Sequence, residues 1–250
     1  MPGQLGGVFA VKSCHWILLR RMKSASKTQL CQKEVVENAG QRLWSRQKGH
    51  AMKYHLPFSR PGQVVGLLGG SFDPPHAGHV HISREALRRF GLDQVWWLVT
   101  PGNPLKKKGP APLSDRIAAC QALLTHPRMA VSDFEAQAGT RYTAESLTAI
   151  QIARPEIRFV WLMGADNLAQ FDHWKGWETI LQRVPVGVLA RPGERISARM
   201  SKAARIYAPF RIKGRESLRL GRSDAPAWCF VNVPMRHISS TELRQAGNWS

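Results

Sequence analysis

One stretch decides the fold: Gly69-Gly70-Ser71-Phe72-Asp73-Pro74-Pro75-His76-Ala77-Gly78-His79. The apolar run Val64-Val65-Gly66-Leu67-Leu68 precedes it, and such runs are typical of strands buried on both faces. After it, apolar side chains recur at helical spacing as far as about Phe90, and Gly91 is a typical helix stop. A buried strand that turns directly into a helix predicts an α/β fold.

The composition of this stretch also indicates a phosphate-binding turn. Gly69 and Gly70 allow the backbone to approach a ligand closely. His76 and His79 are three residues apart, so they project from one side of the first helical turn, whose N–H groups and partial positive charge favour anions. We therefore expect a polyphosphate here. A zinc site is disfavoured, because the two histidines lack the i, i+4 spacing and no third ligand is near them.

The rest of the chain alternates strand and helix signals. This alternation predicts a doubly wound, mostly parallel sheet with helices on both faces and a ligand site beyond the carboxyl ends of the strands. Further strands are expected at 94–99, 129–134, 157–163, 186–190 and 228–233. Helices are expected from Ser114 as N-cap, from Thr143, and at 167–171, 174–182, 196–206 and 239–247.

The charge of the 250-residue chain is strongly basic, with a net value of +19. Such a balance favours nucleic acid, anionic membranes or phosphorylated metabolites as partners. Residues 1–60 hold 11 Lys and Arg against 2 Asp and Glu. We therefore divide the chain into a basic extension, 1–60, and a folded domain, 61–250.

The extension admits three interpretations: a disordered tail, a transit-like peptide, or translated upstream sequence that the natural protein lacks. We favour the third, because Met52 lies twelve residues before the first strand. No apolar run in the chain reaches the ~18 residues that cross a bilayer, so no membrane partner is expected.

The four cysteines, Cys14, Cys31, Cys120 and Cys229, contain no C-x-x-C spacing. Neither a disulfide framework nor a zinc site is indicated. Cys120 lies on an apolar helical face and Cys229 in an apolar strand, which predicts buried free thiols. Free thiols are typical of a reducing compartment, and we expect a cytoplasmic protein.

The histidine-containing stretch resembles the H-x-G-H signature of the nucleotidylyltransferase superfamily, and its G-G-S-F-D-P-P-H form resembles the nicotinate-nucleotide adenylyltransferase branch. The resemblance extends over residues 64–247. Trp161-Leu162-Met163-Gly164-Ala165-Asp166-Asn167 resembles the G-x-D segment of the family, and Trp174-Lys175-Gly176-Trp177 its W-x-x-W segment. Ile238-Ser239-Ser240-Thr241-Glu242-Leu243-Arg244 resembles the closing I-S-S-T-x-x-R segment, and Arg141-Tyr142-Thr143 the Y-T at a helix start.

This resemblance implies a Rossmann-like nucleotidylyltransferase fold and a specific reaction. The adenylyl group of ATP, accompanied by Mg2+, passes to nicotinate mononucleotide, giving deamido-NAD and pyrophosphate. The implied catalytic residues, which also bind ATP, are His76, His79 and Arg244. The other implied ATP-binding residues are Gly69, Gly70, Ser71, Phe72, Asp166, Ser240 and Thr241, and the nicotinate-nucleotide-binding residues are Lys106, Tyr142, Thr143, Ala144, Trp174 and Lys175. No protein ligand to a metal is implied.

Several of these residues also have a structural interpretation. Ser240, Thr241 and Arg244 combine hydroxyls, a helix start and a guanidinium, which suits a second phosphate cradle, but they also suit a capped surface helix. Asp166 fits two roles, as a ligand of ribose hydroxyls or as the N-cap of a helix. Trp174 also fits two roles, stacking on a pyridine ring or packing in the core.

Two alternative functions remain open. The first is a sister transferase of the same fold that acts on phosphopantetheine or nicotinamide mononucleotide. The second is nucleic-acid binding, prompted by the charge, although the basic residues lack the aromatic interleaving of a stacking platform. An aminoacyl-tRNA synthetase is disfavoured by the short chain and the lack of a K-M-S-K-S string. We expect ATP and nicotinate mononucleotide as partners and leave open whether the chain forms a homo-oligomer.

Overall fold

The computed structural model describes residues 54–102, 109–190, 195–234 and 240–245. Most of the expected extension, 1–53, and the expected substrate ligand Lys106 lie outside the described residues. Residues 54–60 contact the folded domain. The Tyr54 ring meets the Phe134 ring edge-on, with centroids 4.9 Å apart, and the Arg154 guanidinium donates to the Ser59 carbonyl at 2.7 Å.

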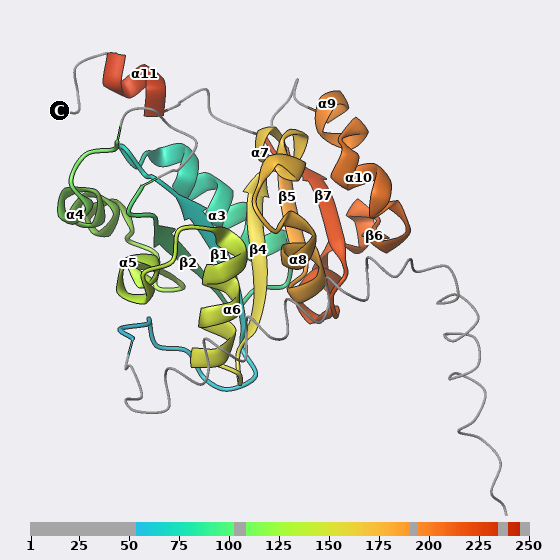
Figure 1. Cartoon of the computed structure of the whole chain (residues 1–250), viewed down its shortest axis with the longest axis horizontal. Coiled ribbons are helices and arrows are strands. Elements are labelled where there is room, and N and C mark those ends of the chain that lie inside the picture. The colour runs from blue at the N-terminus through green and yellow to red at the C-terminus, as the bar shows by residue number, and fades with distance from the viewer. Residues whose placement is uncertain (1–53, 103–108, 191–194, 235–239, 246–250) are drawn as a thin grey trace, which may run out of the picture. The chain divides into compact units, whose positions relative to one another are not determined.

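The centre of the domain is a seven-stranded sheet in which every pair of neighbouring strands is parallel. The strand order is β3-β2-β1-β4-β5-β7-β6, which confirms the predicted doubly wound sheet (Figure 1). The strands are β1 (Val64–Gly70), β2 (Gln94–Val99), β3 (Met129–Ser132), β4 (Arg158–Gly164), β5 (Val186–Ala190), β6 (Arg211–Ile212) and β7 (Trp228–Asn232).

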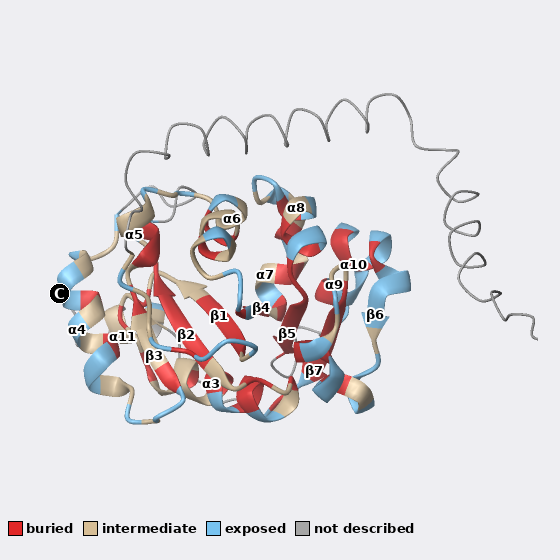
Figure 2. Ribbon diagram, turned by 90° about the horizontal axis from the view of Figure 1, so that it is seen from below, coloured by how far each residue is buried: buried red, intermediate tan, exposed pale blue. Residues whose placement is uncertain are grey.

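Helices cover both faces of the sheet, and each face has its own apolar core. Figure 2 shows the strands as the most continuously buried part of the domain. One core lies against α3 (Ala77–Arg89), α4 (Leu113–Leu123) and the 3-10 helix η4 (Gly214–Arg222). The other lies against α5 (Phe134–Ala138), α6 (Thr143–Ala153), α7 (Ala165–Ala169), α8 (Trp177–Arg183), α9 (Arg195–Met200) and α10 (Lys202–Ile206). The remaining helices are η2 (Phe171–His173), η3 (Ala208–Phe210) and α11 (Ser240–Gln245).

Adjacent residues of β2 show how the strands supply both cores. Trp96 and Trp97 are both fully buried but point to opposite faces of the sheet, as successive strand residues must. Each indole N–H has an acceptor: Gln94 Oε1 at 2.8 Å for Trp96, and Ser83 Oγ at 2.7 Å for Trp97. These bonds remove the cost of burying an unpaired donor.

Three expectations about element boundaries are wrong. Ser114 does not cap α4, because the helix begins one residue earlier and the Ser114 hydroxyl donates to Asp115 instead. The strand expected at 129–134 ends at Ser132, and Phe134 begins the unpredicted helix α5. The basic segment before β7 holds the short strand β6 and the 3-10 helix η4, neither of which was predicted.

The expected helices after β4 also differ in detail. The helix expected at 174–182 begins at Trp177, so Trp174 lies in the turn before it. The helix expected at 196–206 is two helices separated at Ser201, whose Oγ accepts the Ala204 N–H at 3.3 Å as an N-cap. The expected capping box of the closing helix involves Ser239, which lies outside the described residues.

The two described cysteines are buried free thiols, as predicted. Burial raises the pKa of the Cys120 thiol to about 12 and that of the Cys229 thiol to about 11, so both stay protonated and unreactive at neutral pH. In the described part of the chain, no helix has the length and apolarity needed to cross a membrane.

The strand order places the ligand site. The chain runs outward from β1 through β2 to β3, then crosses to the other side of β1 and continues through β4 and β5. The connections after β1 and β4 therefore diverge, and a crevice opens at the carboxyl ends of these two strands.

Candidate active site

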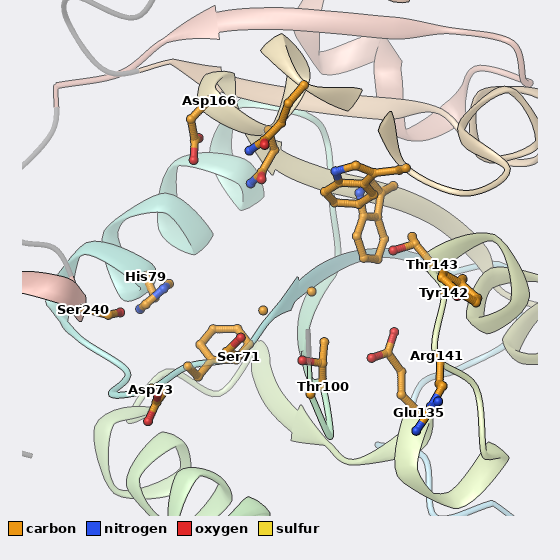
Figure 3. Close-up of a pocket in the computed structure, with 18 of the residues that line it drawn as sticks. Ser71, Asp73, His79, Thr100, Glu135, Arg141, Tyr142, Thr143, Asp166 and Ser240 are labelled. Atoms are coloured by element: carbon orange, nitrogen blue, oxygen red, sulfur yellow. The ribbon is translucent and has the colours of Figure 1, made fainter. Parts of the chain in front are cut away.

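A cavity of about 670 Å³ lies at this crevice. Its walls come from the segments that follow β1, β2 and β4, from the start of α6, and from α11. In Figure 3, Asp73, His79 and Ser240 lie at one side of the cavity, and Glu135, Arg141, Tyr142 and Thr143 at the other. The structure therefore brings together most of the residues singled out in the sequence.

Glycine is required at the end of β1 by close contact with an indole. A Cβ atom on Gly69 would lie 2.4 Å from Cη2 of Trp161, which is shorter than any real contact. The Trp161 ring can therefore lie across the strand and form part of the cavity wall only because Gly69 has no side chain. Gly70 is less constrained, with its nearest contact to Phe72 at 3.3 Å.

Phe72 has a backbone conformation that non-glycine residues rarely adopt, with φ of 47°. Its ring is buried and stacks on Trp97, with centroids 4.7 Å apart and planes inclined by 9°. This stacking places the aromatic ring in the core on the α3 side of the sheet, and Phe72 is also one of the residues that line the cavity.

His76 and His79 cap the start of α3. Nδ1 of His76 accepts the Gly78 N–H at 3.1 Å, and Nδ1 of His79 accepts the His76 N–H at 3.2 Å. A ring nitrogen that accepts a backbone N–H carries no proton, so the proton of each neutral ring is on Nε2. Both histidines thus have a structural role as caps of this helix. This role does not exclude a ligand role for His79, which also lines the cavity, whereas the buried His76 does not.

Helix α11 contacts the turn that precedes α3. The Ser240 hydroxyl donates to the Pro74 carbonyl at 2.9 Å. The Arg244 guanidinium donates to the Asp73 carbonyl, and one of its nitrogens lies 3.4 Å from the Asp73 carboxylate. Ser240, Thr241 and Arg244 all line the cavity, so three predicted phosphate ligands lie on the same side as His79.

Asp166 lies in the first turn of α7 and lines the cavity. The N-cap of this helix is Gly164, so the capping interpretation of Asp166 is wrong. The Asp166 carboxylate is close to the Gly164 backbone: a Cβ atom on Gly164 would lie 2.2 Å from Asp166 Oδ1.

The opposite side of the cavity combines aromatic and cationic groups. Trp174 is half-buried, meets Phe171 edge-on at 5.4 Å, and lines the cavity, so it packs on the core and is also available to a ligand. The Lys175 ammonium lies 4.1 Å from the centroid of the Tyr142 ring and 3.6 Å from the Glu145 carboxylate. Tyr142, Thr143 and Lys175 line the cavity, but Ala144 does not.

Nine residues of the cavity wall were not predicted from the sequence to belong to the site: Asp73, Thr100, Gly102, Glu135, Arg141, Trp161, Asn167, Gln170 and His173. Thr100 follows the last residue of β2, a position that the switch-point rule alone singles out. Thr100 Oγ1 and Trp161 Nε1 are buried and have no hydrogen-bond partner in the structure. Unpaired buried polar atoms are costly, and at a ligand site they mark groups that a bound molecule or water satisfies.

Glu135 is the buried acid of the cavity wall, with 6% of its surface exposed. Burial raises the pKa of its carboxyl group to about 7, although a hydrogen bond from Ser146 opposes this effect. Ser146 also contacts the Thr140 hydroxyl at 2.9 Å, so a short polar chain joins α5 to the first turn of α6.

The described residues contain no group of three or more His, Cys, Asp or Glu side chains that could hold a metal ion.

Comparison with known proteins gives consistent results. A family model described as cytidylyltransferase-like matches residues 67–246. A protein of Ruegeria pomeroyi named probable nicotinate-nucleotide adenylyltransferase is 65% identical over 199 residues, which cover 80% of this chain and 93% of the relative. A protein of Agrobacterium fabrum with the same name is 48% identical over 182 residues, covering 72% and 97%.

Solved structures resemble the fold more distantly. Nicotinic acid mononucleotide adenylyltransferase of Plasmodium falciparum, solved in complex with NaAD, superposes with a TM-score of 0.56 at 16% identity, covering 72% of this chain and 82% of that one. The same protein in complex with APC gives a TM-score of 0.55 at 15% identity, covering 73% and 83%. At this identity the likeness concerns the fold.

Proposed function

The chain belongs to the nicotinate-nucleotide adenylyltransferases, within the cytidylyltransferase-like family, and we propose that it transfers the adenylyl group of ATP to nicotinate mononucleotide in this cavity. The phosphate of the mononucleotide attacks the α-phosphorus of ATP, deamido-NAD forms, and pyrophosphate leaves. The attacking phosphate is already anionic, so no protein nucleophile is needed. Catalysis then depends on positioning the two substrates and stabilising the charge that develops between them.

One observation carries this proposal: a single cavity joins two chemically different ends. His79 and Ser240 lie at one end (Figure 3), where Thr241 and Arg244 of the same helix α11 add a donor and positive charge. Tyr142 and Thr143 lie at the other end (Figure 3) and supply a helix start, and Trp174 adds an aromatic surface to the cavity wall. A reaction between one substrate that carries a polyphosphate and a second that carries a flat carboxylated ring requires this division.

At the phosphate end, we assign His79 to the α-phosphate of ATP. Its Nε2 proton is a neutral hydrogen-bond donor to the oxygens that gain charge in the transition state. Arg244, Ser240 and Thr241 hold the β- and γ-phosphates, which leave together as pyrophosphate. His76 acts on the same phosphates only through the first turn of α3, which it caps. The backbone of Gly69, Gly70, Ser71 and Phe72 borders the bound nucleotide.

At the other end, Trp174 stacks on the pyridine ring. The first N–H groups of α6, from Thr143 and Ala144, have no partner within the helix. The Thr143 N–H receives the ring carboxylate together with the Lys175 segment, and Ala144, which does not line the cavity, contributes through the positive end of the helix. Asp166 accepts hydrogen bonds from the ribose hydroxyls of ATP. Lys106, which lies outside the described residues, is assigned to the phosphate of the mononucleotide.

Mg2+ fits this site as a companion of ATP. The described part of the cavity wall contains the carboxyl groups of Asp73, Glu135 and Asp166, but no cluster of three metal ligands. This arrangement suits an ion that is held mainly by phosphates and water. When bound, the ion neutralises phosphate charge. We propose that residues 61–250 are the catalytic domain, that the basic extension is not needed for the reaction, and that the enzyme works in the cytoplasm, where its thiols stay reduced.

The test is pyrophosphate release by the purified chain with MgATP and either nicotinate or nicotinamide mononucleotide. We expect turnover with nicotinate mononucleotide and much weaker turnover with nicotinamide mononucleotide. Equal turnover would remove the specificity part of the proposal, and no release with either substrate would refute the activity.

A further inference from the structure

Arg116 is a fully buried arginine of α4 that lies just outside the cavity wall. A buried charge is costly unless hydrogen bonds satisfy it. The guanidinium meets this requirement entirely with backbone carbonyls. It donates hydrogen bonds to the carbonyl oxygens of Ala111 (2.8 Å), Ser71 (2.6 Å), Thr100 (2.8 Å) and Pro101 (3.3 Å).

These four carbonyls belong to three segments that are distant in the sequence. Ser71 lies in the turn after β1, Thr100 and Pro101 lie at the end of β2, and Ala111 lies on the approach to α4. One planar side chain therefore fixes the relative positions of three segments at the carboxyl edge of the sheet. We call this set of bonds the Arg116 clamp.

The clamp also sets the direction of two backbone N–H groups. In a planar trans peptide, the C=O and the following N–H point in opposite directions. The Ser71 carbonyl faces Arg116, so the Phe72 N–H points away from Arg116. The Pro101 carbonyl likewise directs the Gly102 N–H away from it. Phe72 and Gly102 both line the cavity.

Phe72 needs such support because of its backbone. A non-glycine residue with positive φ is strained and persists only where its surroundings fix it. The ring is fixed by stacking on Trp97, and the preceding carbonyl is fixed by Arg116. The side chain and the backbone of Phe72 are thus held by two different contacts.

Asp73 extends the clamp to α11. Its Oδ1 accepts the Ala111 N–H at 3.3 Å, and its Oδ2 lies 3.4 Å from the Arg244 guanidinium. Burial lowers the pKa of the Arg116 guanidinium, and the negative charge of Asp73 opposes this effect. The segment held by Arg116 is therefore in contact with the helix that carries the proposed phosphate ligands.

We propose that Arg116 is a positioning residue for adenylyl transfer, which directs the N–H groups of Phe72 and Gly102 toward the substrate phosphates without itself touching substrate. This inference rests on the proposed function of the cavity. Lysine keeps the charge but cannot reach four carbonyls in three directions. The Arg116→Lys variant therefore separates the geometry of the clamp from its charge.

The experiment compares Arg116→Lys with Leu220→Ala, a variant of a fully buried residue in η4 that does not line the cavity. Both variants lose thermal stability. For Arg116→Lys we expect kcat per folded molecule to fall about 10²-fold, the scale of a misplaced reacting group. We expect its Kd for ATP, measured by calorimetry, to rise about tenfold, the scale of a lost hydrogen bond. For Leu220→Ala we expect both quantities to stay near the wild-type values.

A second variant, Arg116→Ala, tests the geometry by chemical rescue. Guanidinium ions at millimolar concentration should restore part of kcat, and sodium chloride at the same concentration should not. The proposal is overturned if kcat and the ATP Kd of Arg116→Lys change no more than those of Leu220→Ala, or if both Arg116 variants stay unfolded even with guanidinium. A wild-type chain that binds ATP without releasing pyrophosphate would refute the proposed reaction. In that case, the comparison of the ATP Kd of Arg116→Lys with that of Leu220→Ala would still test the positioning role of Arg116.

Discussion

Nδ1 of His79 accepts the backbone N–H of His76 at 3.2 Å, so the side chain that faces the cavity is held by the residue that caps the same helix. This bond fixes both the orientation of the His79 ring and the nitrogen that carries its proton. The ring therefore has a structural edge, at Nδ1, and an edge proposed to face phosphate, at Nε2. Different substitutions can remove one edge and keep the other.

His79→Ala removes both edges, and we expect kcat to fall at least ~10²-fold, the scale of a lost charge-stabilising donor. His79→Asn should preserve the cap, because its amide oxygen can replace Nδ1, but it supplies no donor at the position of Nε2. We expect His79→Asn to keep the wild-type melting temperature and still lose kcat. Steady-state kinetics and thermal melts measure both. Near-normal kcat in His79→Asn would show that the histidine serves only as a cap, and His126→Ala, outside the cavity wall, is the control.

Trp174→Ala should weaken the pyridine nucleotide far more than ATP. Stacking of a base on an aromatic ring contributes about 1–3 kcal/mol, so we expect KM for nicotinate mononucleotide to rise about tenfold or more. Because Trp174 also contacts Phe171, Trp174→Phe serves as the matched variant that keeps an aromatic ring. Equal increases in both KM values for Trp174→Ala would indicate that the residue acts only as part of the core.

Glu135 should make stability depend on pH. Its pKa is about 7 in the folded chain against an ordinary value of 4.5, so between these values the unfolded chain is ionised while the folded chain keeps the proton. The stabilising contribution is full below pH 4.5 and is lost as pH rises toward 7, a difference of roughly 3 kcal/mol. Urea unfolding from pH 5 to 8 measures this trend.

Glu135→Gln should remove that trend, because the amide does not titrate. The exposed Glu178→Gln, in α8, is the matched control and should leave it unchanged. Retention of the full pH dependence in Glu135→Gln would mean that another group is responsible.

Removal of residues 1–51, so that the chain begins at Met52, should leave kcat and both KM values within about twofold, because the described residues of the cavity wall all lie between Gly69 and Arg244 and are retained. Residues 54–60 remain and keep their contacts with Phe134 and Arg154. Salt-dependent binding to DNA or RNA, if the full chain shows it, should fall with the loss of basic residues. Loss of turnover, or binding that survives the truncation undiminished, would contradict this assignment.

The long elements of the fold were predictable because each carries its own periodic pattern. The buried run of β1 and the amphipathic face of α3 can each be recognised from a short local stretch of the sequence. Short elements have no such pattern. β6 is two residues long and α5 five, too short to repeat a period, and the two form because neighbouring strands and helices provide partners for them.

The same distinction applies to the cavity. The histidines, Trp174 and the Ser240–Arg244 segment were predictable because each lies in a compact motif. Glu135 and Arg116 were not, because their environments arise from tertiary packing. Glu135 is buried by the packing of its helix, α5, and Arg116 is surrounded by three segments that are distant in the sequence. In the sequence, Arg116 is one more basic residue in a basic chain.

The contact between Arg244 and Asp73 joins residues 171 positions apart, and α11 follows all seven strands in the chain. On the ribosome, β1 and its turn emerge long before α11, so a nascent chain can complete its sheet while the phosphate end of the cavity still lacks Arg244, Ser240 and Thr241. The proposed ATP site is therefore complete only once α11 has packed against the turn that follows β1.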